Sequence, residues 1–199
     1  MAVYRPEELS AFFRSRRAVR KPEITFAEKG WRHYCAPNPL PLFRLAKRNS
    51  QSDPHLCNAI LWQLMRYPFI GSGLSVVEFV LLGELKAKGK VGLAIGRTAV
   101  DDDAVLMGDF EELYQAAWIF MHAPVPLIEA QKGKAKVGSR EEFNKLAVKL
   151  TSTGEKVLSG KLDHVATNGI DRWIGGVHLK GKKVQWRWDP SRHVLRRSD

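Results

Sequence analysis

Residues 168–179 read NGIDRWIGGVHL, and residues 186–189 read WRWD. Together these two motifs hold three Trp, three Gly, two Asp, two Arg and one His. Large aromatic rings and charged side chains are costly to bury without partners, so this density marks either a closely specified piece of structure or a site. The C-terminal tail is therefore the most constrained part of this sequence.

Most residues of this tail have a structural explanation. Neighbouring side chains point in different directions, so we expect Arg172 to turn away from Asp171 and form a two-pronged ion pair with Asp189. The Asn168-Gly169 pair predicts a turn, and Gly175-Gly176 predicts a close backbone approach or positive φ angles. Residues 177–179 and 184–188 are expected to pair as a hairpin, with tryptophan rings packed beneath it. This structural hypothesis involves Asn168, Asp171, Arg172, Trp173, Trp186, Trp188 and Asp189.

A catalytic alternative uses the same stretch. Asp171 and His178 would act as an acid–base pair, Arg172 would hold an anion, and His164 would be an additional group. No nucleophile accompanies them, because the GSGLS run at 71–75 is not a nucleophile elbow. Buried polar networks are commoner than active sites, so we prefer the structural hypothesis and expect a protein that is not an enzyme.

Turn signals divide the chain in two. Residues 1–70 carry helix patterns bounded by prolines, and Gly71-Ser72-Gly73 is the predicted boundary. After it come helices at 76–88 and 110–121 with a short helix or turn at 90–98, then strands at 126–130 and 146–150 around a basic loop. This is the order of a winged helix, a variant of the helix-turn-helix. The predicted fold class is mainly α with a small antiparallel β element (α+β): a helical N-terminal region, 1–70, and a winged-helix-like domain with a C-terminal hairpin, 71–199.

The sequence also resembles a family of uncharacterised bacterial proteins that contain a domain of unknown function. The similarity begins near Trp31 and APNP at 36–39, and continues through GLS at 73–75 with Glu78, MGD at 107–109 and LT at 150–151 with Gly154. It ends with NGIDRWIGGVHL and WRWD, which are its specific motifs, and covers about four fifths of the chain. The resemblance implies a winged-helix-like C-terminal part and no established activity. Family members usually carry an α/β region before these motifs, so it also implies that this region is absent or supplied by a separate α/β protein partner.

Charge is distributed unevenly along the chain, whose formal net charge is +11. Residues 1–50 hold 11 basic and 4 acidic residues (+7), residues 51–130 hold 5 and 10 (−5), and residues 131–199 hold 16 and 7 (+9). Basic ends favour DNA or RNA through phosphate contacts, and a solvated lysine-rich surface is the alternative. The residues expected to bind nucleic acid without sequence preference are Arg14, Arg16, Arg17, Arg20, Lys132, Lys134, Lys136 and Arg140, with Arg196 and Arg197 beside them.

The predicted helix at 110–121 would enter the major groove if this winged helix bound DNA in the usual way. Its sequence, FEELYQAAWIFM, contains no Lys or Arg. Asp109, Glu111 and Glu112 stand at its start, where carboxylates would repel phosphates and where helix capping explains Asp109 and Glu112. Groove reading by this helix is therefore not expected.

Other function classes are disfavoured. No apolar run approaches the roughly 20 residues of a membrane span, and the start lacks the apolar stretch of a signal peptide, so we expect a cytoplasmic protein. Cys35 and Cys57 do not make a disulfide framework. The HxC patterns at 33–35 and 55–57 hold zinc-type ligands, but residues two apart on a helix face away from each other, and the acids at 101–103 suit a solvated loop. We therefore expect no metal. Phosphate-binding and dinucleotide-binding loops are also missing from the sequence, so we expect no cofactor.

The sequence thus predicts a regulatory or adaptor binding module. It would contact nucleic acid through its basic ends or a protein partner through its acidic middle. Two alternatives remain: an enzyme of unknown reaction with a site at Asp171, Arg172 and His178, and a purely protein-interacting module that pairs with a separate α/β protein.

Overall fold

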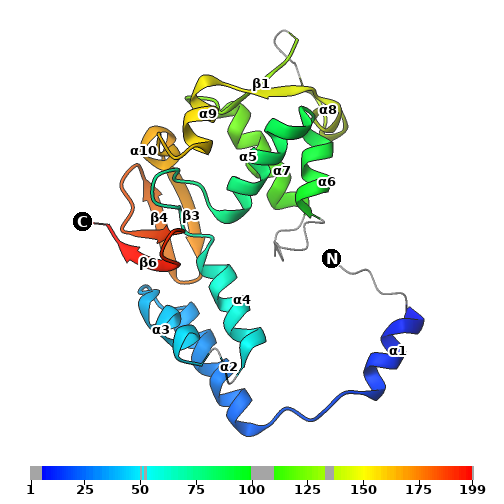
Figure 1. Ribbon diagram of the computed structural model, residues 1–199, viewed down its shortest axis with the longest axis vertical. Coiled ribbons are helices and arrows are strands. Elements are labelled where there is room, and N and C mark those ends of the chain that lie inside the picture. The colour runs from blue at the N-terminus through cyan, green and yellow to red at the C-terminus, as the bar shows by residue number, and fades with distance from the viewer. Residues whose placement is uncertain (1–5, 50, 52, 100–109, 133–136, 199) are drawn as a thin grey trace.

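The computed structural model describes residues 6–49, 51, 53–99, 110–132 and 137–198 (Figure 1). Within these residues the chain forms ten α-helices and six short strands, which pair in three separate antiparallel hairpins. The fold class is therefore α+β, as the sequence predicts. One lobe in Figure 1 holds α2–α4 with the C-terminal hairpins, and the other holds α5–α10 with the first hairpin.

The described part of the N-terminal region is helical, with α1 (Pro6–Arg14), α2 (Lys21–Tyr34), α3 (Leu40–Asn49) and α4 (Pro54–Leu64). Local signals start two of these helices. The side chain of Glu23 accepts a hydrogen bond of 2.7 Å from the Arg20 N–H ahead of α2. The side chain of Asp53 accepts one of 3.1 Å from the Leu56 N–H, with Pro54 in the first position of α4.

The next part contains α5 (Val76–Lys88), α6 (Val91–Ala99), α7 (Phe110–His122), β1 (Ile128–Ala130), α8 (Arg140–Lys145) and β2 (Val148–Leu150). A capping box between Ser75 and Glu78 starts α5, and Gly89 ends it at a φ of +62°. β1 pairs antiparallel with β2, and Lys90 forms an antiparallel bridge to Ala147. The order of these elements is the order predicted for a winged helix, and the assignment to that fold stays a prediction. The structure adds α8, a short helix between the two predicted strands, whose first turn is capped by the Ser139 side chain accepting from the Glu142 N–H.

The C-terminal part contains α9 (Ser152–Leu158), α10 (His164–Asn168), β3 (Ile170–Ile174), β4 (Val177–Gly181), β5 (Trp186–Asp189) and β6 (Val194–Arg197). The predicted hairpin between 177–179 and 184–188 is wrong. β4 pairs with β3, with Ile174 opposite Val177, and β5 pairs with β6. The reason lies in Gly175, whose φ of +56° lets the chain reverse within two residues.

Residues 68–70, just before the predicted domain boundary, join β5. The Ile70 N–H donates to the Trp188 carbonyl over 2.8 Å, and the Trp188 N–H donates to the Pro68 carbonyl over 3.0 Å. The Trp188 indole is buried and meets the Phe43 ring of α3 edge-to-face at 6.1 Å. Buried side chains of α3–α7 and of all three hairpins form one cluster. The division into 1–70 and 71–199 therefore stays a prediction.

α1 lies apart from both lobes, at the end of an extended segment that leads to α2 (Figure 1). Among the described helices, none combines the length and the apolar character that crossing a membrane requires.

Candidate functional site

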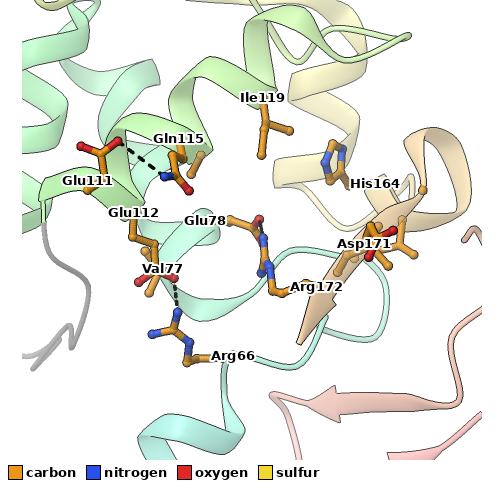
Figure 2. Close-up of a pocket in the computed structure, with 15 residues that line it drawn as sticks. Arg66, Val77, Glu78, Glu111, Glu112, Gln115, Ile119, His164, Asp171 and Arg172 are labelled. Atoms are coloured by element: carbon orange, nitrogen blue, oxygen red, sulfur yellow. Dashed lines mark hydrogen bonds and ion pairs between the residues drawn. The ribbon is translucent and has the colours of Figure 1, made fainter. Parts of the chain in front are cut away.

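A cleft of about 570 Å³ lies between α5, α7, α10 and β3 (Figure 2). Charged side chains from three of these elements reach it. Arg172 enters from β3, Glu78 from α5 and Glu112 from α7. Arg172 of the NGIDRWIGGVHL motif therefore points into this cleft.

Glu78 and Arg172 form an ion pair at the centre of the cleft. Glu78 is only 6% exposed, and its second oxygen accepts a 2.8 Å hydrogen bond from the Ser75 N–H. Burial raises the pKa of Glu78, but the charge and hydrogen bond of Arg172 and the bond from Ser75 outweigh it and lower the pKa to about 2. Glu78 therefore remains ionised across the physiological range and is not a proton donor.

The predicted ion pair between Arg172 and Asp189 is wrong. Side chains alternate along β3, and the alternation turns Arg172 toward α5. Asp189 instead organises the β5–β6 turn. It accepts hydrogen bonds from the Ser191 hydroxyl at 2.7 Å and from the N–H groups of Ser191 and Arg192, and it pairs with Arg196 at 3.2 Å.

A second ion pair joins Arg66, just after α4, to Glu112 of α7 at one side of the cleft. Glu112 thus has a tertiary partner in addition to the capping role that the sequence suggests. Asp109, the other residue of that predicted capping box, lies outside the described residues. Both arginines that line the cleft are therefore neutralised by carboxylates of the same chain.

His164 occupies the α10 side of the cleft and is 5% exposed. The Asn168 amide donates to its Nδ1 over 3.2 Å, and its ring lies edge-to-face with Phe120. Burial lowers the pKa of His164, although the nearby charges of Glu78 and Asp163 oppose this effect. The Asn168 side chain also bonds both the N–H and the carbonyl of Val125, so His164 and Asn168 fasten α10 to the segment after α7.

Asp171 and His178 meet on the outward face of the β3–β4 hairpin, and Asp171 also lines the edge of the cleft (Figure 2). His178 Nε2 lies 2.7 Å from Asp171 Oδ1, and Lys180 Nζ lies 3.4 Å from the other carboxylate oxygen. The hydrogen bond with His178 lowers the pKa of Asp171, with a smaller effect from Lys180. His178 does not line the cleft. The Arg172 side chain points into the cleft and therefore away from His178. The structure therefore makes the predicted acid–base contact but does not bring all three predicted catalytic residues together.

The three signature tryptophans have different environments. Trp186 and Trp188 are 6% and 1% exposed, as the structural hypothesis requires. Trp173 is 65% exposed, so the expectation that it packs beneath the hairpin is wrong. It lies on the outward face of β3, where its ring stacks on His178 with centroids 4.4 Å apart.

The predicted nucleic-acid-binding residues that the structure describes lie in separate regions. Arg14 and Arg16 are exposed at the end of α1 and beyond it, while Arg17 and Arg20 both pair with Glu23. Arg140 lies at the start of α8, far from α1 in Figure 1. Lys132 and Arg197 are exposed, Arg196 pairs with Asp189, and Lys134 and Lys136 lie outside the described residues.

A second hollow, of about 470 Å³, lies on the other side of α7 against α8 and the residues before it. Its lining is mainly apolar and includes Tyr114, Trp118, Val137 and Phe143. Sequence reasoning missed this groove. The available signal is the composition of α7, which carries large apolar residues on more than one face, so that Trp118 and Ile119 remain 42% and 47% exposed.

The HxC pairs show no chelating geometry. His55 is exposed and Cys57 is buried in α4, while Cys35 follows the last residue of α2. Throughout the described ranges, no three His, Cys, Asp or Glu side chains are grouped so as to hold a metal ion. Residues 101–103 are not among those described.

Comparison of this chain with protein-family models, curated proteins and solved structures found no match. The features that bear on function are therefore the two hollows beside α7 and the outward face of the β3–β4 hairpin.

Proposed function

We propose that this chain is a bacterial, cytoplasmic binding module of winged-helix-like architecture, regulatory or adaptor in role, that docks a polypeptide partner over α7. The observation that carries this proposal is the position of three α7 residues. Glu111, Gln115 and Ile119 follow each other at four-residue spacing, and each lines both the charged cleft and the apolar groove. These three residues therefore form a ridge on the outward face of α7, with the charged cleft on one side and the apolar groove on the other.

Charge at this ridge argues against DNA as its ligand. Arg66 pairs with Glu112, and Arg140 pairs with Glu111 at 2.6 Å while its guanidinium lies 3.9 Å over the Tyr114 ring. These arginines are already engaged by carboxylates of α7, so binding phosphates would require breaking an ion pair in each case. The remaining polar group on the ridge, Gln115, carries no charge.

Apolar exposure argues for a polypeptide. Trp118 and Ile119 stand next to a groove with an apolar lining, and paired charges surround it. An apolar centre with a polar rim and exposed aromatic residues is the usual composition of a protein–protein contact. The family resemblance of the sequence suggests the kind of partner, a separate α/β protein.

A photoreactive amino acid placed at position 119 tests the proposal. On illumination in cells we expect a covalent adduct whose mass does not change on nuclease treatment. The matched control is position 93, because Leu93 on α6 is also apolar and 58% exposed but lies outside both hollows.

The adduct at 119 should be suppressed by excess wild-type chain and not by an Ile119→Glu variant. A nuclease-sensitive adduct at 119, equal adducts at 119 and 93, or no adduct specific to 119 would each contradict polypeptide docking at α7.

A further inference from the structure

The outward face of the β3–β4 hairpin presents a fixed aromatic ring to solvent. His178 covers part of the Trp173 indole with the two rings 6° from parallel, and Trp173 is still 65% exposed. The hydrogen bond between His178 and Asp171 holds the imidazole in place beneath the indole. A ring that is already fixed loses little conformational freedom when a flat ligand stacks on it.

Beside Trp173 lies a hollow of about 460 Å³, bounded by the hairpin, by Pro37 and by the segment that leads into β5. Lys180 and Lys183 both line it, and Lys182 between them is exposed. The acidic group on this face, Asp171, pairs with Lys180 at 3.4 Å and is hydrogen-bonded to His178. Lys183, which lines the hollow, and the exposed Lys182 beside it therefore leave this face with an excess of positive charge.

The aromatic surface continues onto α2. Gly175 in the β3–β4 turn packs against Tyr34, so close that an added Cβ would lie 2.9 Å from the Tyr34 ring. Trp31 lies one turn earlier on α2, with its ring centroid 5.6 Å from that of Tyr34, and is 68% exposed. Arg32 next to it is also exposed. Two solvent-facing indoles and several cations thus lie around the junction of α2 with the hairpin.

We infer that this face binds single-stranded nucleic acid, with a base stacked on Trp173 and an adjoining phosphate on Lys183. Exposed aromatic rings combined with a basic hollow are what unpaired bases and a phosphate backbone require. Bases inside a duplex are already stacked and do not offer their faces. A neutral sugar would also stack on an indole but would gain nothing from the lysines. The site uses none of the α7 residues, so it is independent of the proposed polypeptide docking.

Binding of fluorescently labelled ten-nucleotide oligothymidine and oligouridine, followed by anisotropy, tests this inference. Trp173→Ala is expected to raise Kd by at least about fivefold, because a stacked base contributes that much or more. Trp173→Phe should retain most of the affinity. Trp118→Ala is the matched control, because it removes another exposed indole outside this face, and it should leave Kd unchanged.

The phosphate contact has its own readout. Lys183→Ala should reduce the slope of log Kd against log salt by roughly 0.7, because a lysine that neutralises one phosphate of a single strand contributes about that much. An abasic strand of the same length should bind weakly and be insensitive to Trp173→Ala. The inference is overturned by undetectable oligonucleotide binding, by equal affinity of wild type and Trp173→Ala, by tighter binding of duplex, or by equal binding of a sulfated polysaccharide that has no bases.

Discussion

Among single residues, Arg172 links two elements that lie far apart in the sequence. It lies 94 positions from Glu78 in the sequence, and their ion pair connects β3 to the start of α5. Because Glu78 is buried and ionised, Arg172→Ala leaves an uncompensated charge in the cleft, and we expect unfolding free energy to fall by about 3–5 kcal/mol. Urea denaturation measures this loss. The double variant Glu78→Gln/Arg172→Met is the control, since it removes both charges and should recover part of the stability. A single variant as stable as wild type would contradict a structural role for the pair.

The same pair predicts a pH dependence. The pKa of Glu78 is about 2 in the folded chain and near 4.5 without the fold, so the unfolded state binds a proton first as pH falls. The stability from this group is therefore complete above about pH 5 and is lost progressively down to about pH 2. Glu78→Gln lacks this titration, so its stability deficit relative to wild type should shrink between pH 6 and pH 2.5. A deficit that does not change across this range, measured by chemical denaturation, would argue against the lowered pKa.

Gly175 and Gly176 allow the β3–β4 turn to approach α2. A Cβ on Gly175 would lie 2.2 Å from the Tyr34 carbonyl oxygen, and one on Gly176 would lie 2.0 Å from the Cys35 carbonyl oxygen. Replacing either glycine by Ala is expected to lower the free energy of unfolding by about 1–3 kcal/mol, because the backbone must move to accommodate the added Cβ. Gly83→Ala on α5 is the matched control. Its added Cβ has open space, so it should stabilise the chain by about 0.5–1 kcal/mol in thermal denaturation. Similar melting temperatures for all three variants would contradict the close approach.

At the scale of elements, the two C-terminal hairpins have different roles. Trp188 of β5 is 1% exposed and contacts α3, whereas Trp173 of β3 is 65% exposed. Trp188→Ala should therefore destabilise the chain by about 3–5 kcal/mol, and Trp173→Ala by less than about 1 kcal/mol, in equilibrium unfolding. Equal losses of unfolding free energy from the two substitutions would show that the outward face of the β3–β4 hairpin is also packed as part of the core.

The same scale shows what the sequence can and cannot predict. Capping boxes and periodicity predict α5 from 76 to 88 and α7 to within a residue, because those signals are local. Strand pairing is not local: β5 has Trp186, Arg187 and Trp188 all buried, so no alternation shows which strand it joins. In the candidate site, the inward direction of Arg172 follows from alternation, but its partner Glu78 does not. The Gly175-Gly176 pair predicts a close approach but not the strands that it connects.

At the scale of the whole molecule, contacts join the chain before residue 70 to the chain after it, and some of them cross between the two lobes. Residues 68–70, which follow α4, bridge to β5. The hydrogen bond of 3.0 Å from the Val76 N–H to the Met65 carbonyl and the ion pair of Arg172 with Glu78 cross between the lobes. Buried side chains of both lobes form one cluster. Unfolding one lobe would therefore expose the buried surface of the other.

We accordingly expect a single unfolding transition in urea, with far-UV circular dichroism and tryptophan fluorescence giving the same midpoint, because contiguous burial makes unfolding cooperative. Deleting residues 1–20 should leave that midpoint nearly unchanged, since α1 lies apart from both lobes. Deleting residues 1–49 removes Phe43 from Trp188 and Tyr34 from the β3–β4 turn, and should lower the midpoint for both signals together. Two separated transitions in the full chain would instead show that parts of the chain unfold independently, and would place the lobe interface among weak interdomain contacts.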